Sequence, residues 1–114
     1  MPYDPALADR LRDLLVDRPM TEKAMFGGIA FMLGEVMAVG VIEDRLVVRT
    51  SPERGAELLA KAPPGLRPMD FTGRPMKGWL YAEGPAIESD AGLRRWVEES
   101  LVFAATAKPS KRRR

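Results

Sequence analysis

Four leucines near the N-terminus recur at the spacing of one helix face, three or four positions apart. Asp4 followed by Pro5 is typical of a helix N-cap with proline in the first helical position, where a missing N–H is tolerated. Pro19 favours an end to the helix just before it. The sequence therefore predicts an amphipathic surface helix that ends near Asp17 and whose apolar face consists of Leu7, Leu11, Leu14 and Leu15.

The pattern changes after Lys23 to apolar runs rich in Phe, Ile, Val and Met. Turn-forming residues at Gly34-Glu35 and at Glu43-Asp44 divide these runs, as turns divide neighbouring strands. We expect a three-stranded antiparallel meander with strands at residues 24–33, 36–42 and 45–49.

Two features of this meander suggest local geometry or function in addition to strand formation. The pair Gly27-Gly28 lies inside the first expected strand and predicts a bulge or a close approach of another backbone or a ligand. In the third strand, side chains alternate between the two faces, so Arg49 points away from the side of Leu46 and Val48. Arg49 is therefore a candidate for a polar face.

The second half of the chain predicts a short helix, two strands and a final helix. Thr50-Ser51-Pro52-Glu53 has the order of a cap, a first-turn proline and a first-turn acid, and the helix is expected to end near Lys61. Extended segments at residues 66–70 and 77–82 are joined by a turn or irregular loop at 71–76. Ser89 or Asp90 can cap the final helix, whose apolar stripe consists of Leu93, Trp96, Val97 and Leu101.

Together these elements predict an α+β fold in the order α-β-β-β-α-β-β-α. A chain of 114 residues has room for one hydrophobic core. We expect two layers, an antiparallel sheet of about five strands with the helices packed on it. One domain is expected over residues 1–107, followed by a flexible basic tail at 108–114.

The chain contains no cysteine and no histidine. Their absence excludes disulfides, thiolate or imidazole metal ligands, and the side chain that most often serves as a general acid or base near neutral pH. No acidic cluster has the spacing of a metal site. We therefore expect a protein that is not an enzyme, holds no metal and uses no cofactor. No apolar run reaches the roughly 20 residues of a membrane span, and no signal peptide is recognisable, so a cytoplasmic location is expected.

The basic character of the chain resides in its C-terminal tail. Removing the five basic residues of the tail from the total of 18 leaves 13 against 16 acidic residues, a net charge of −3 for the rest of the chain. The tail is a candidate for salt-sensitive, non-specific contact with nucleic acid, although a solubilising end has the same composition. Its basic residues are Lys108, Lys111, Arg112, Arg113 and Arg114.

A second group of charges lies around the loop at 71–76. Asp70, Arg74 and Lys77 are close in sequence, and Arg49 is expected near them across the sheet. Arginine and lysine side chains can hold a phosphate or carboxylate through charge-assisted hydrogen bonds. The structural alternative is that Asp70 caps its own turn and pairs with Arg74 or Lys77, which would fix the loop without binding a ligand.

Two stretches resemble one known family. The first is Lys23-Ala24-Met25-Phe26-Gly27-Gly28-Ile29-Ala30-Phe31-Met32, continued by residues 37–41 and 44–49, and the second is Arg67-Pro68-Met69-Asp70-Phe71-Thr72-Gly73-Arg74-Pro75-Met76-Lys77-Gly78-Trp79. Both resemble the N-terminal domain of the TfoX/Sxy family of bacterial competence regulators. The resemblance implies a two-layer α+β domain, a role in transcription of DNA-uptake genes, and action alongside the cyclic AMP receptor protein. Longer family members carry a second, C-terminal domain, whereas in this chain only a short basic tail follows the matching region. We therefore expect a stand-alone N-terminal domain here.

These observations lead to three functional hypotheses. The first is a regulatory or interaction module that contacts a protein partner, such as a transcription factor, with weak nucleic-acid contact through the tail. The second is a small-anion or metabolite-binding domain that uses the Arg/Lys cluster. The third is a chaperone-like homodimer, because the first expected strand is apolar on both of its faces.

Overall fold

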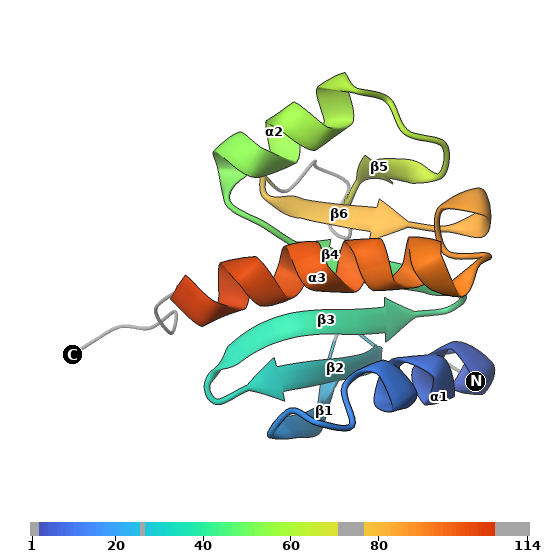
Figure 1. Cartoon of the computed structure of the whole chain (residues 1–114), viewed down its shortest axis with the longest axis vertical. Coiled ribbons are helices and arrows are strands. Elements are labelled where there is room, and N and C mark those ends of the chain that lie inside the picture. The colour runs from blue at the N-terminus through green and yellow to red at the C-terminus, as the bar shows by residue number, and fades with distance from the viewer. Residues whose placement is uncertain (1–2, 26, 71–76, 107–114) are drawn as a thin grey trace.

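The computed structural model describes residues 3–25, 27–70 and 77–106 (Figure 1). Within these residues, the elements follow one another along the chain as α1, β1 to β4, α2, β5, β6, a short 3-10 helix η1, and α3. The helices and strands are α1 (Pro5–Leu14), β1 (Met20–Met25), β2 (Gly28–Leu33), β3 (Val36–Ile42), β4 (Arg45–Arg49), α2 (Pro52–Ala60), β5 (Leu66–Pro68), β6 (Trp79–Ala82), η1 (Gly84–Ala86) and α3 (Asp90–Thr106).

All six strands belong to one sheet, in the order β1-β2-β3-β4-β6-β5. Every neighbouring pair is antiparallel. The three α-helices lie over the sheet, with α3 across its middle and α2 beside β5 and β6 (Figure 1). The predicted α+β class, with helices packed on an antiparallel sheet, is confirmed.

The expected single strand at residues 24–33 is wrong: this region contributes to two strands, β1 and β2, which form a hairpin. Gly27 has a φ of +76°, a left-handed conformation that glycine adopts without steric strain, and it reverses the chain between the strands. The sheet therefore has six strands rather than about five. β1 escaped prediction because it carries the polar run Thr21, Glu22 and Lys23 and is exposed on the sheet's edge.

Side chains cap the helices where the sequence predicts. The Asp4 carboxylate accepts a hydrogen bond from the Ala6 backbone N–H at 3.0 Å, and Ser51 Oγ accepts one from the Arg54 backbone N–H at 3.1 Å. Ser89 Oγ accepts from the Gly92 backbone N–H at 3.0 Å at the start of α3. The first helix ends at Leu14, three residues earlier than expected, with Leu15 as its C-cap.

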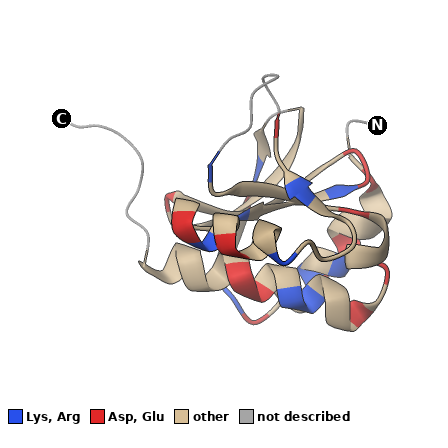
Figure 2. Cartoon of the chain, turned by 90° about the horizontal axis from the view of Figure 1, so that it is seen from above, with Lys and Arg blue, Asp and Glu red and all other residues tan. Residues whose placement is uncertain are grey.

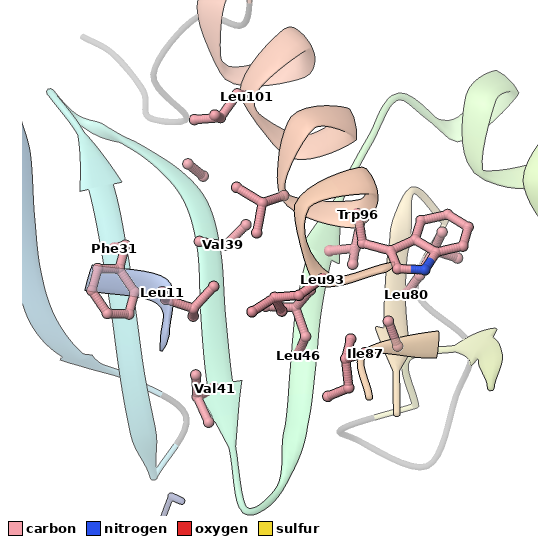
Figure 3. Close-up of a cluster of buried hydrophobic side chains, with 14 of the residues drawn as sticks. Leu11, Phe31, Val39, Val41, Leu46, Leu80, Ile87, Leu93, Trp96 and Leu101 are labelled. Atoms are coloured by element: carbon pink, nitrogen blue, oxygen red, sulfur yellow. The ribbon is translucent and has the colours of Figure 1, made fainter. Parts of the chain in front are cut away.

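The larger core lies between the helices and one face of the sheet (Figure 3). Trp96 and Leu93 of α3 are fully buried in it, together with Leu11 of α1. The sheet contributes alternate side chains of its central strands, as a half-buried strand should. The labelled sheet residues of this core are Phe31, Val39, Val41, Leu46 and Leu80.

A second, smaller cluster of buried side chains lies on the other parity of the strands. Val47 of β4 pairs with Tyr81 of β6, so their side chains share a face. The cluster consists of Ala30, Met37, Ile42, Val47, Met69 and Tyr81, with Met25, Met32 and Trp79 packed against it. Arg49 follows Val47 by two positions and belongs to this same face.

The close approach predicted at Gly27-Gly28 is confirmed at Gly28. A Cβ atom at this position would overlap the carbonyl oxygen of Val41, far inside contact distance. We predict that Gly28→Ala lowers the free energy of unfolding by about 2 kcal/mol or more, because either β2 or β3 must shift to admit the methyl group. Denaturant titration followed by circular dichroism measures this change.

Gly34→Asn is the matched control for that substitution. Gly34 has a φ of +65° with nothing within 4 Å of an added Cβ, and asparagine tolerates this conformation. Its effect should stay within about 1 kcal/mol. Equal destabilisation by the two variants would contradict the role assigned to the contact between position 28 and Val41.

Candidate binding site around Arg49

The structure describes three of the four residues of the predicted Arg/Lys cluster, namely Arg49, Asp70 and Lys77. Arg49 ends β4, and its cross-strand neighbour is Trp79 of β6. Asp70 is exposed, and its carboxylate lies 3.7 Å from the guanidinium of Arg67 on β5. Lys77 is exposed just before β6, and Arg74 lies outside the described residues. The structure therefore places Arg49 next to Trp79, while Asp70 is engaged by an arginine that the sequence did not single out.

Two aromatic rings hold the side chain of Arg49. Its Cζ atom lies 4.7 Å from the ring centroid of Trp79 and 5.0 Å from that of Phe103 on α3. The backbone N–H of Arg49 donates a hydrogen bond of 2.9 Å to Oγ of the fully buried Ser100, also on α3. Sheet and helix together thus fix the position of this arginine.

The guanidinium of Arg49 has aromatic neighbours but no acidic one within the described ranges. No carboxylate of residues 3–25, 27–70 or 77–106 lies within the 4.0 Å of an ion pair with it. Burial lowers the pKa of Arg49, because the charged form has less contact with water. A partly buried guanidinium without an acidic neighbour favours the binding of an anion from another molecule.

Two other arginines on the same face have both an aromatic and an acidic neighbour. The guanidinium groups of Arg45 and Arg67 lie 4.5 Å and 4.8 Å from the ring centroid of Tyr81. Arg45 pairs with Glu43 at 2.8 Å, and Arg67 pairs with Glu83 at 3.0 Å. The hydrogen bond from Arg67 to Glu83 raises the pKa of Arg67.

Two surface hollows adjoin the rings that hold Arg49. The first, called here the Trp79 hollow, has a volume of about 360 Å³ and lies between α2 and β6; its wall includes Trp79, Lys77, Pro52 and Leu59. The second, the Phe103 hollow, has a volume of about 280 Å³ and lies between the start of α2 and the end of α3; its wall includes Phe103 and Val102. Val102 is 68% exposed, so the wall of this second hollow includes an accessible apolar side chain. Consecutive residues after Arg49 line the two hollows, Thr50 and Ser51 the second and Pro52 the first.

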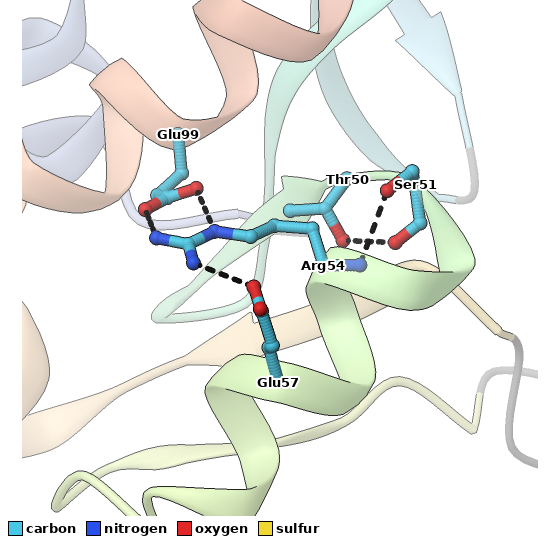
Figure 4. A network of polar contacts seen from close by, with 5 residues as sticks. All are labelled: Thr50, Ser51, Arg54, Glu57 and Glu99. Carbon is cyan, nitrogen blue, oxygen red and sulfur yellow. Dashed lines mark hydrogen bonds and ion pairs between the residues drawn. The ribbon is translucent and has the colours of Figure 1, made fainter.

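A polar network fixes the segment between the hollows (Figure 4). Thr50 donates its backbone N–H to the Gly78 carbonyl at 2.7 Å and its hydroxyl to the Ser51 carbonyl at 2.9 Å. Arg54 makes a two-point contact with Glu99 of α3, at 3.0 Å from Nε and 2.6 Å from Nη2. This contact ties α2 to α3 beside the Phe103 hollow.

The sequence pointed to Arg49 but not to the residues that hold it. Trp79 and Phe103 are far from Arg49 in sequence, and they reach it only because β4 pairs with β6 and α3 crosses β4. Trp79 and Tyr81 lie two positions apart on β6 and share a face, as alternation along a strand requires. The Arg54 contact with Glu99 carried no sequence signal.

The described residues contain no group of three or more acidic, histidine or cysteine side chains placed to hold a metal ion. Among them there is also no helix long and apolar enough to cross a membrane. The basic tail residues lie outside the described part of the chain.

Fold and site define a small two-layer α+β domain with an arginine held on an aromatic platform at the junction of sheet and helix. Residues 10–104 match the family model of the TfoX N-terminal domain. The chain therefore belongs to the TfoX N-terminal domain family, as the two sequence stretches indicated. Comparison with curated proteins and with solved structures gave no significant match.

The tie between Arg54 and Glu99 has a pH dependence that can be measured. The hydrogen bond from Arg54 lowers the pKa of Glu99 from its ordinary value of 4.5. A carboxyl group whose pKa is lower in the folded than in the unfolded state stabilises the folded protein at pH values above its ordinary pKa. This stabilisation disappears as the pH falls through the folded-state pKa. We predict that Glu99→Gln lowers the free energy of unfolding at pH 7 by about 1 kcal/mol after solvent screening, a difference that shrinks below pH 4.5.

Urea titrations of both proteins at several pH values test this expectation. Glu57→Gln is the matched control, because Glu57 also contacts Arg54 but its side chain is 64% exposed. We expect it to change stability by no more than about 0.5 kcal/mol. A Glu99→Gln effect that stays constant through the acid range would contradict the assigned role of the carboxylate.

Proposed function

We propose that this protein is a non-enzymatic regulatory module that acts through contact with a protein partner. The observation that carries the proposal is the match to the TfoX N-terminal domain over residues 10–104, most of the chain. In keeping with that family, we propose a role in transcription of DNA-uptake genes and a cytoplasmic site of action. The partner we propose is a protein of the transcription machinery.

The surface around the end of α3 supports the choice of a protein partner. Val102 is exposed and adjoins Phe103, whose ring is partly buried. Protein interfaces combine such apolar and aromatic side chains with arginine at their centres. Arg49 lies against Phe103, so all three side chain types occur together here.

A pull-down of the full tagged chain from its native cells, with quantitative mass spectrometry, tests the proposal. We expect one protein to be enriched at a fixed ratio to the chain and to remain with it through size-exclusion chromatography. Val102→Asp should reduce its recovery about tenfold or more, because a charge would be buried in the interface. Val16→Asp is the control, since Val16 is 76% exposed in a different region, beside α1.

Three results would contradict this function. Equal recovery with both aspartate variants would separate the captured protein from this surface. A retained small molecule in place of a protein would favour the anion-binding alternative. Unfolded proteins of many kinds would favour the chaperone-like one.

We propose in addition that the tail makes weak, non-specific contact with nucleic acid. Replacing Lys108, Lys111, Arg112, Arg113 and Arg114 with glutamine should weaken binding to a 20-base-pair duplex. The slope of log affinity against log salt concentration should fall by about 0.9 for each phosphate that the tail no longer neutralises. Fluorescence anisotropy at several salt concentrations measures both quantities, and an unchanged slope would exclude the tail as the contact.

A further inference from the structure

We propose that Arg49 binds a carboxylate from an acidic segment of the protein partner, with an aliphatic residue of that segment seated beside Val102 and Phe103. The inference rests on the proposed interaction function and deepens it by assigning the contact. It comes from a comparison of three arginines on one face of the sheet.

Arg45, Arg49 and Arg67 share one environment and differ in one component. Each has its guanidinium carbon within 5.0 Å of an aromatic ring centroid. Arg45 and Arg67 also have a carboxylate partner, in Glu43 and Glu83. Arg49 has none among the described residues, although it has two rings rather than one. Arg49 therefore has the aromatic part of the arrangement seen at Arg45 and Arg67, without the carboxylate that those two arginines have beside them.

The geometry of Arg49 leaves its hydrogen-bond donors suited to a carboxylate. A cation–π contact uses the flat faces of the guanidinium, whereas the five N–H donors lie in its plane. Two of these donors match the two oxygens of a carboxylate. The rings and the bond from the Arg49 backbone to Ser100 hold the group in place, which reduces the entropic cost of binding.

The charges around the site favour a single carboxylate over a polyanion. Lys77 adds a cation in the Trp79 hollow, where Glu53 adds an anion. In the Phe103 hollow, Glu99 and Arg54 satisfy each other. Figure 2 shows Lys and Arg interspersed with Asp and Glu over the helices rather than gathered into one basic surface. With a net charge of −3 outside the tail, this body would repel a nucleic-acid backbone but admit one acidic side chain.

The hollows beside the rings explain the expected aliphatic neighbour. Val102 offers exposed apolar surface in one, and Leu59 and Pro52 line the other. A peptide that places Leu next to Glu can bury its leucine there while the carboxylate reaches Arg49. The apolar contact supplies affinity, and the ion pair supplies orientation and discrimination.

NMR titration of the full chain with a defined peptide tests the assignment. The probe is acetyl-Gly-Ser-Leu-Glu-Leu-Ser-Gly-amide, and its counterpart has Gln in place of Glu. We expect saturable shifts of the Arg49 Nε–H and Trp79 Nε1–H signals with the Glu peptide. The Gln peptide should bind about tenfold or more weakly, the effect of removing one charge-assisted hydrogen-bonded pair.

Variants connect this binding to the guanidinium itself. Arg49→Gln should weaken the Glu peptide about tenfold and remove its preference over the Gln peptide. Arg49→Lys, which retains the charge without the planar fork, should keep part of the preference. Arg45→Gln is the matched control on the same strand and face, and it should leave peptide binding unchanged. The dispersed amide spectrum of each variant shows whether it is folded.

Several outcomes would overturn the assignment. The first is equal binding of the two peptides, and the second is the absence of binding at millimolar peptide. The third is a set of NMR shifts confined to another surface. The fourth is a 12-nucleotide single-stranded DNA that shifts the Arg49 Nε–H signal at a lower concentration than the peptide does. A partner captured in the pull-down with equal efficiency by wild type and Arg49→Gln would leave the interaction function standing while the role of Arg49 fails.

Discussion

The seating of α3 on the two central strands is the contact on which the rest of this structure depends. Leu93, Trp96 and Leu101 of the helix enter the same buried cluster as Val39 of β3 and Leu46 of β4. Because the helix is 17 residues long, the register that buries these side chains also fixes the residues near its C-terminal end. Ser100 and Phe103 reach Arg49 as a direct consequence. The geometry of the candidate site is therefore set by core packing rather than by a loop.

This origin explains how the partly buried guanidinium of Arg49 can persist although no carboxylate of the described residues lies within ion-pair distance of it. Desolvation disfavours the charge, and each cation–π contact returns only about 0.5–2 kcal/mol. The burial of large apolar side chains under α3 stabilises the fold by far more than this deficit, so Arg49 remains in place. Arg45 and Arg67 differ from it in having a carboxylate beside the guanidinium, that of Glu43 and that of Glu83. Residues that are held at some cost to stability are commonly those that serve binding.

Local signals in the sequence predicted the elements well, whereas contacts between distant elements could not be read from it. Asp4 and Ser51 could be predicted as N-caps, because an N-cap depends only on a few neighbouring residues. β1 was missed because an edge strand that faces water carries no apolar pattern. The partners of Arg49 were missed because β6 lies next to β4 although a helix and β5 separate them in the chain. The contact between Arg54 and Glu99 joins residues 45 positions apart for the same reason.

The two edges of the sheet indicate why side chains rather than backbone groups should make the partner contact. β5 is three residues long and ends at Pro68, which has no N–H to donate to an added strand. β1 is longer. If β1 of a second copy of the chain paired with it about a two-fold axis, one residue of β1 would lie opposite the same residue of the other copy. In the registers centred on the strand, this places Glu22 against Glu22 or Lys23 against Lys23. Like charges directly opposite one another destabilise such a pair, so both edges resist strand addition. The surface at the end of α3, with Arg49 between its two rings, has no such protection.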